Sequence, residues 1–265
     1  MPELAEVEIV RRNLERWWLG RRAEEVRVLD PKLAFLAEPL RELMAREVEA
    51  VRRRGKLLIV AVAGGAHVLF HLRMTGKIVR AEGPRPSSSA RLSWRLDDGE
   101  WLVFKDRRRF AEVRVMAPGE LEGYEPLQSM GPEPHEVDAA RLAELLACRR
   151  RLKDRLMDQR VIAGIGNIAV SEVFWRIGLP PDVRCDALTP DQIAALAAAL
   201  PAYFDWLIEV ESADEIAYVN EGKNTPSPFS IYGRGGEPCP RCASPIESET
   251  IGSRTSYFCR ACQGL

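Results

Sequence analysis

The stretch Pro2-Glu3-Leu4-Ala5-Glu6 decides how the chain begins to fold. Apolar residues follow at the spacing of an amphipathic helix, namely Leu4, Val7, Val10, Leu14 and Trp17. A proline in the first turn and acids beside it are ordinary features of a helix N-terminus. Taken alone, the stretch therefore predicts only the start of a helix.

The same stretch also permits covalent chemistry. Met1 is normally removed before a small residue such as Pro2, and this removal frees a secondary amine on a rigid ring. An α-amino group titrates near about pH 8, so part of it is neutral in the cell. A neutral amine can attack an electrophilic carbon and form an iminium, and Glu3 can move protons for it. While Met1 remains, the amine is blocked.

The length of the chain is enough for two domains, or for one domain with appendages. The chain has 265 residues, of which 46% are hydrophobic. It contains no run of about 18 apolar residues and no apolar signal-peptide core, so we expect no membrane partner and a cytoplasmic location.

The net charge of −1 hides an asymmetry. Residues 182–222 hold nine acids and one base, a net of −8, which leaves +7 for the remainder. The bases cluster at Arg52–Arg54 with Lys56, at Arg107–Arg109, and at Arg149–Arg151 with Lys153. Local positive charge can bind phosphate, although each cluster alone also fits a solvated face.

Short alternating segments over residues 24–117 predict an antiparallel sandwich or barrel, with a hairpin turn at 97–99. A linker is expected at 118–134. Helices are predicted at Ala139–Cys148, Leu152–Gln159, Asn167–Ile177 and Asp191–Val210, the last of them broken at Pro201.

Four cysteines have the spacing of a metal site: Cys239, Cys242, Cys259 and Cys262. Two CxxC turns can place four thiolates tetrahedrally around one Zn²⁺, and with no open position the ion would be structural. Cys148 and Cys185 stand alone, which fits a reducing cytoplasm. Arg254, between the two turns, can hold a phosphate or simply face solvent.

A glycine turn, Gly164-Ile165-Gly166, precedes the helix that begins near Asn167. Glycines permit close backbone approach, and free N–H groups at a helix start attract phosphate. Asn167 can contact phosphate or cap the helix, and an ordinary capped turn is the simpler interpretation of this motif alone.

Together these motifs resemble the formamidopyrimidine-DNA glycosylase branch of a DNA-repair family that also includes endonuclease VIII. Six blocks follow in the family's order: MPELAEVE, HLRMTG, DRRRFA, MGPEP, LMDQRVIAGIGNIAVSE and YGRGGEPCPRC…SRTSYFCRACQ. The resemblance covers nearly the whole chain.

The resemblance implies an α+β, multidomain fold. Its parts are an N-terminal antiparallel β-sandwich with the first helix (1–128), a helix–two-turns–helix domain (129–222), and a loop with a C-terminal zinc hairpin (223–265). It further implies damaged double-stranded DNA as the partner, one structural zinc ion, a monomer, and a bacterial cytoplasmic protein associated with the nucleoid.

The resemblance also implies roles for individual residues. Pro2 matches the Schiff-base nucleophile, Glu3 the acid that protonates the opening sugar, and Glu6 a further acid. The residues that match the family's DNA contacts are Lys56, His71, Lys153, Asn167 and Arg254. Of these, Lys56 also matches a residue that assists elimination, and Arg254 one that is linked to the second elimination. Met74, Arg108 and Phe110 match the residues that fill the space of a flipped base, although Met74 and Phe110 also fit an ordinary sheet core.

The chain departs from the family pattern at several positions. Arg107 and Ala111 replace a proline and a glycine, and Ala169 replaces a tyrosine. The histidine that the family offers near residues 87–91 is missing. The loop at 221–229 is short for a lesion cap and contains two prolines.

We therefore expect a bifunctional DNA glycosylase and lyase that removes oxidised or ring-opened purines by β,δ-elimination. The alternative is a damage- or structure-specific DNA-binding protein that keeps the scaffold but turns over poorly.

Overall fold

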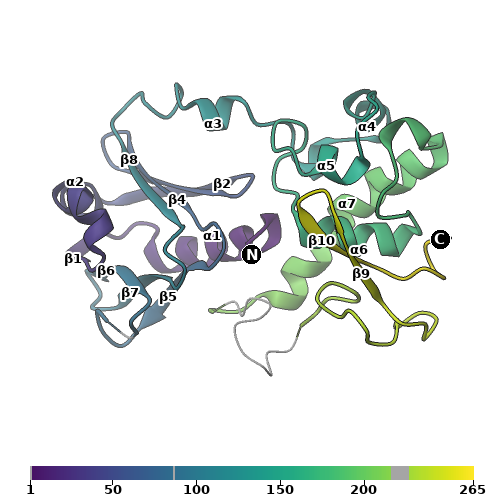
Figure 1. Ribbon diagram of the computed structural model, residues 1–265. Helices are drawn as coiled ribbons and strands as arrows, with labels where there is room; N and C mark the ends of the chain where they lie inside the picture. Colours follow the sequence, from purple (N-terminus) through teal and green to yellow (C-terminus); the bar gives the residue numbers. More distant parts are fainter. Residues whose placement is uncertain (1, 86, 216–226) are drawn as a thin grey trace. The chain divides into compact units, whose positions relative to one another are not determined.

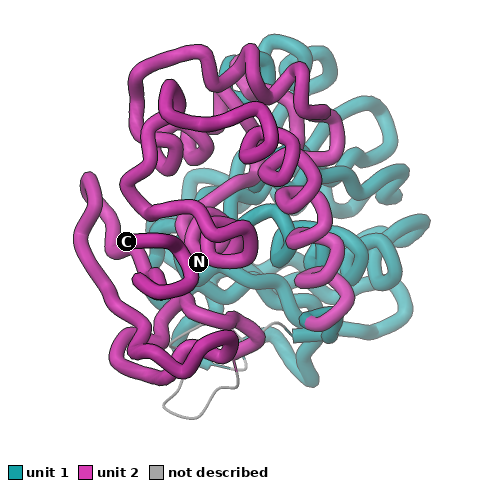
Figure 2. The backbone as a smooth tube through the Cα atoms, turned by 90° about the vertical axis from the view of Figure 1, so that its right-hand side faces the viewer, with its two compact units in different colours: residues 1–128, 211–225 teal, residues 129–210, 226–265 magenta. Residues whose placement is uncertain are grey.

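The computed structural model describes residues 2–85, 87–215 and 227–265. The chain divides into two compact units, Met1–Gln128 with Glu211–Thr225, and Ser129–Val210 with Pro226–Leu265 (Figure 2). The finer division of the sequence into three domains stays a prediction.

The first unit contains α1 (Leu4–Trp18) and two four-stranded antiparallel sheets (Figure 1). The strand orders are β1-β6-β7-β5 and β2-β3-β4-β8. The strands are β1 (Ala23–Val28), β2 (Val48–Arg54), β3 (Leu57–Val62), β4 (Ala66–His71), β5 (Gly76–Ala81), β6 (Ala90–Leu96), β7 (Trp101–Asp106) and β8 (Glu112–Met116). The helix start, the antiparallel sandwich and the β6–β7 hairpin are thus confirmed.

An aromatic cluster joins the two sheets and α1. The Trp94 ring of β6 lies 5.0 Å from that of Trp18 and 6.3 Å from that of Phe70, between ring centroids. Phe70 of β4 also contacts Phe104 of β7 at 5.6 Å. All four side chains are fully buried. Because β4 lies in one sheet and β6 and β7 in the other, this cluster forms the core between the two sheets.

The prediction of strands throughout residues 24–117 is wrong at one place. The chain forms a 3-10 turn at Pro31–Leu36 and a helix, α2, at Ala37–Met44. The buried face of α2 is Leu40, Leu43 and Met44. This pattern spans little more than one helical turn, so it does not stand out among neighbouring strands.

The second unit is helical and ends in a two-stranded hairpin. Its elements are α4 (Ala139–Leu145), α5 (Leu152–Leu156), α6 (Asn167–Ile177), α7 (Pro190–Glu211), β9 (Glu247–Ile251) and β10 (Arg254–Phe258). The short α3 (Glu125–Gln128) belongs to the first unit. The last residue of α7 belongs to the first unit. The helix at Asn167–Ile177 is confirmed, whereas α4 and α5 end before the predicted Cys148 and Gln159.

The predicted break of the last helix at Pro201 is wrong, because α7 runs through it. A proline removes one helical hydrogen bond, and buried residues on both sides, such as Leu196 and Phe204, hold the two halves in line. By length and composition alone, α7 is also apolar enough to cross a membrane, a test that buried core helices pass too. The absence of a membrane partner stays a prediction.

Candidate active site and zinc centre

Two buried acids lie at the beginning of α1. The Glu3 side chain accepts a hydrogen bond from the backbone N–H of Glu6, and the Glu6 carboxylate accepts one from the N–H of Glu3 at 2.9 Å. Their side chains are 2% and 3% exposed, and Pro2 is buried beside them. This capping box both starts the helix and fixes two carboxylates next to Pro2.

Burial sets the proton affinity of one of these acids. It raises the pKa of Glu6 to about 7, and the negative charge of Glu3 adds to the shift. A carboxyl group with a pKa near neutrality can both accept and release a proton at physiological pH. The start of α1 therefore holds a proton carrier beside the residue that carries the amine after processing.

Lys56 lies in the tight turn between β2 and β3, directly after Gly55, whose φ is 55°. The next residue, Leu57, pairs with His71 at the end of β4. Burial, together with the charges of Arg73 and Lys56, lowers the pKa of His71 to about 4. The ring is therefore neutral, and because its Nδ1 accepts the N–H of Arg73 at 3.1 Å, its proton lies on Nε2. His71 can offer phosphate a hydrogen bond but no charge.

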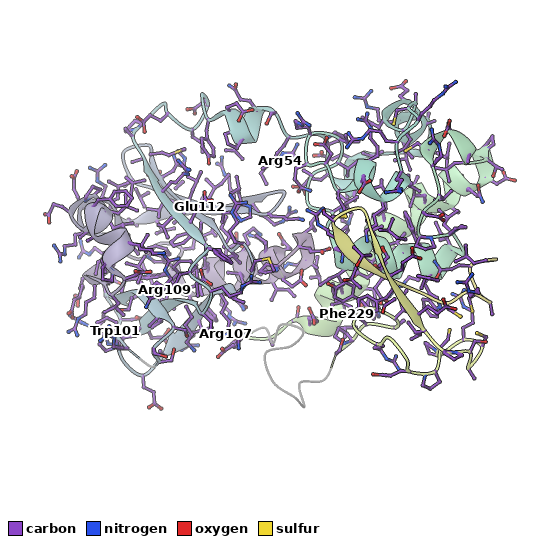
Figure 3. The ribbon with its side chains drawn as sticks, in the orientation of Figure 1. Arg54, Trp101, Arg107, Arg109, Glu112 and Phe229 are labelled. Atoms are coloured by element: carbon purple, nitrogen blue, oxygen red, sulfur yellow. The ribbon has the colours of Figure 1, made fainter. Side chains whose placement is uncertain are left out.

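The turn between β4 and β5 presents the half-buried Met74. Arg73 has a φ of 54°, and its Nε donates to Glu112 at 3.1 Å. Glu112 lies at the start of β8 and is labelled in Figure 3. A Cβ at Gly76 would meet the backbone oxygen of Leu72 at 2.5 Å, so only glycine fits there. These constraints fix the direction in which Met74 leaves the sheet.

The loop after β7 presents Arg108 and Phe110 at the surface. Phe110 is 55% exposed, and the guanidinium of Arg108 lies 4.9 Å from the centre of its ring. Figure 3 shows Arg107 and Arg109 on the same loop. The exposure rules out the alternative that Phe110 is sheet core.

A buried ion network that sequence reasoning missed supports this loop. Arg91 of β6 donates to Asp30 at 2.6 Å, to Asp106 at 3.3 Å and to the backbone oxygen of Ala111 at 2.9 Å. Asp106 in turn accepts the backbone N–H groups of Arg108 at 3.2 Å and Ala111 at 2.7 Å. The partners lie far apart in sequence, so their spacing carries no signal.

In the second unit, one polar side chain of α5 and one of α6 each donate a hydrogen bond to β10. Lys153, only 2% exposed, donates to the hydroxyl of Ser256. Asn167 donates to the backbone oxygen of Thr255 at 2.9 Å, while its buried Oδ1 has no hydrogen-bond partner in the described part of the chain. Burial and the charge of the exposed Arg254 lower the pKa of Lys153 to about 8. Asn167 is the first residue of α6 rather than its cap, which is Gly166.

The four predicted zinc ligands lie together. The sulfur atoms of Cys239, Cys242, Cys259 and Cys262 are all within 4.8 Å of one another. This donor set fits one tetrahedral Zn²⁺. Cys239 and Cys259 also pack with Trp175 of α6, and Arg241 lies 4.3 Å from the Trp175 ring, so the metal-binding segment is anchored on α6.

The loop at 221–229 was predicted to be too short to cap a lesion in the usual way. Its residues 221–226 lie outside the described residues. Of the remainder, Phe229 is buried and lies 6.1 Å from Tyr232 between ring centroids.

Three family models match the chain. They are described as the formamidopyrimidine-DNA glycosylase N-terminal domain at residues 1–113, the formamidopyrimidine-DNA glycosylase H2TH domain at residues 130–214, and the zinc finger found in FPG and IleRS at residues 236–264. The third match contains all four clustered cysteines, and with their geometry it confirms the predicted structural zinc site.

Curated proteins and solved structures are similar over the whole chain. The formamidopyrimidine-DNA glycosylase of Chloroflexus aggregans is 38% identical over 100% of this chain and 99% of its own, and that of Moorella thermoacetica is 36% identical over 93% and 94%. The crystal structure of the MutM (Fpg) protein from Thermus thermophilus is 31% identical, with a TM-score of 0.81 over 99% of both chains. The Lactococcus lactis Fpg in complex with DNA containing an abasic site is 28% identical, with a TM-score of 0.86 over 98% and 99%.

Proposed function

Because the chain belongs to the formamidopyrimidine-DNA glycosylase family, we propose that it is a bifunctional DNA glycosylase and lyase of base excision repair. Its substrate is double-stranded DNA that carries an oxidised or ring-opened purine. The observation that carries this proposal is the buried start of α1, where Pro2 adjoins Glu3 and Glu6.

Pro2 acts as the nucleophile once its amine is free and neutral. The nitrogen attacks C1′ of the damaged nucleotide, and the base leaves with the electrons of the glycosidic bond. Glu3 gives a proton to the sugar ring oxygen, so that the sugar opens and an iminium forms. Elimination of the 3′ and then of the 5′ phosphate releases the sugar remnant and leaves a one-nucleotide gap.

Phosphate contacts hold the strand during these steps. Lys56 and Arg254 supply positive charge and assist the eliminations, whereas neutral His71 and Asn167 supply hydrogen bonds. Lys153 contributes charge from beneath β10. Support for this assignment comes from the cluster of Lys153, Asn167 and the β10 hairpin, which resembles a preformed anion site.

Three side chains compensate for extrusion of the damaged base, which costs a few kcal/mol. Met74 and Phe110 replace the lost stacking, and Arg108 bonds the orphaned partner base. Two observations support these roles. The backbone of the turns that carry the three residues is fixed by hydrogen bonds and close contacts, and the side chains of Phe110 and Arg108 are exposed.

The alternative of a catalytically weak DNA-binding protein is not favoured, because the acids beside Pro2 are buried and ordered rather than lost. We further propose that the protein acts as a monomer without a membrane partner in the bacterial cytoplasm. Relatives solved with damaged DNA support the location at the nucleoid.

Borohydride trapping tests the proposed reaction. The processed protein should become covalently linked to DNA with an abasic site, because borohydride reduces the iminium. Pro2→Gly should trap at least tenfold less, and Glu209→Gln, an exposed change elsewhere, should trap normally. Equal trapping by protein with a blocked N-terminus would remove Pro2 from the mechanism.

A further inference from the structure

Two short segments carry the residues proposed to replace the extruded base. The turn between β4 and β5 presents Met74, and the loop after β7 presents Arg108 and Phe110. Strands β5 and β7 are antiparallel neighbours, and Gly76, the first residue of β5, pairs with Asp106, the last residue of β7. The turn and the loop therefore leave the sheet side by side, at the same end of two paired strands.

The hydroxyl group of Thr75 joins the turn to the loop. Its oxygen donates a hydrogen bond to Oδ1 of Asp106 and accepts one from the backbone N–H of Arg108 at 3.1 Å. The same Asp106 oxygen also accepts that N–H, at 3.2 Å. Thr75 follows Met74 directly in the chain. Because a hydroxyl group both donates and accepts, Thr75 bonds at once to the backbone of Arg108 and to the carboxylate that orients it.

The backbones on both sides of this link have unusual conformations. The φ angle is 54° at Arg73 and 56° at Arg109. Residues other than glycine rarely adopt this left-handed conformation, and they keep it only where the surrounding structure fixes them. A Cβ atom at Gly76 would lie 3.0 Å from the Cβ of Ala111, so the end of the turn also packs closely against the end of the loop. Hydrogen bonding and packing thus fix the turn and the loop relative to each other.

We infer that Thr75 is a positioning residue that links the turn to the loop, so that Met74 and Arg108 enter the DNA together when the damaged base is turned out. This inference rests on the proposed function, in which both residues compensate for the loss of the base. Turning the base out is unfavourable, so the extruded state depends on how well the vacated space is filled. With the link, entry of either residue brings in the other. Without it, each segment must be ordered separately.

Loss of the hydroxyl group should slow removal of the base. The substrate is a duplex that carries a ring-opened purine, and the measurement is the single-turnover rate of base release. Thr75→Val keeps the shape of the side chain but neither donates nor accepts, so we expect a rate about tenfold lower, the scale of one hydrogen bond to a charged group. Thr75→Ser keeps the hydroxyl group and should retain the wild-type rate. A serine variant as slow as the valine variant would overturn the inference.

A second background separates a link from local support of Arg108. In Met74→Ala the link has no residue to bring in, so adding Thr75→Val should slow base release further by less than about twofold. If Thr75 only held the backbone of Arg108, the full tenfold effect would persist in this background, and that result would overturn the inference. Thr75→Ala, which also removes the hydroxyl group, should give the same two results and provides a second test if valine disturbs the turn.

Borohydride trapping separates this inference from the proposed function. An abasic site has no base to turn out, so Thr75→Val should trap on it within about twofold of the wild type. An equal loss of trapping and of base release would show a general defect and would overturn the inference. If the wild type traps and Thr75→Val releases the base at the wild-type rate, the inference fails and the proposed function stands. If the wild type does not trap, the proposed function fails and the inference fails with it.

Discussion

At the scale of single residues, Arg108 should determine which base is accepted opposite the lesion. Its backbone is fixed by Asp106 and its guanidinium is stacked on Phe110, so its donors are oriented before DNA binds. We expect the protein to prefer cytosine opposite the lesion, and Arg108→Ala should weaken this preference by roughly 1–3 kcal/mol, the value of one good base contact. Single-turnover rates on duplexes that differ only in the opposite base measure this preference. Arg107→Ala removes the same charge from the same loop and should leave the preference intact.

Lys153 should make DNA affinity depend on pH. Its pKa is lowered to about 8 by burial and by Arg254, so it loses its charge as pH rises through that value. Affinity for abasic-site DNA should therefore fall between pH 7 and pH 9. In Lys153→Gln the affinity should be weaker throughout and should change less over this range. Parallel curves for the two proteins, measured by fluorescence anisotropy at constant salt, would contradict the assignment.

Some residues of the candidate site could be predicted from the sequence, and others could not. Pro2, Glu3 and the cysteines are recognisable because their chemistry depends on short spacings. The network of Asp30, Arg91 and Asp106 was not predictable, since Asp30 follows β1, Arg91 lies on β6 and Asp106 on β7, and the three meet only after the sheet forms. The proton affinity of Glu6 was hidden for a similar reason, because it depends on burial rather than on residue type.

At the scale of elements, the loop after β7 should depend on the carboxylate of Asp106. Asp106→Asn would leave Arg91 with a weaker partner and would lose a charged acceptor for the Ala111 N–H. Unsatisfied buried polar groups cost about 1–3 kcal/mol each, so the free energy of unfolding should fall by that amount. Urea denaturation measures this, and the exposed change Asp191→Asn should have little effect. Wild-type stability of Asp106→Asn would show that the network does not support the loop.

Comparison of the predicted and observed helices and strands shows where hydrophobic periodicity predicts an element and where it does not. The hairpin at residues 92–103 and α6 were predicted because each has a long, regular pattern with a clear turn or glycine stop. Helix α2 was missed because eight residues between strands give too few repeats. The break at Pro201 was wrong because packing along both halves of α7 outweighs one lost hydrogen bond.

At the scale of the whole molecule, zinc should stabilise one unit and leave the other folded. The zinc ligands Cys239 and Cys259 share a buried core with Trp175 and Ile231 in the second unit. Loss of the metal would therefore leave thiolates of the same charge close together in this core. The first unit has a separate core around Trp94 and does not use the cysteines.

Removal of zinc should therefore abolish DNA binding without unfolding the sandwich. The β9–β10 hairpin carries Arg254 and supplies the hydrogen-bond acceptors for Lys153 and Asn167. If the hairpin unfolds, the residues of the proposed phosphate site are no longer held together. A ribbon with so small a core gains its stability from the metal, and chelation is expected to unfold it. Chelated protein should keep the near-ultraviolet signal of the buried Trp18–Trp94 pair and regain DNA binding when Zn²⁺ is restored. Cys148→Ser, which changes a cysteine outside the cluster, should bind DNA normally. Undiminished binding after verified metal loss would mean that the hairpin folds by packing on α6 alone.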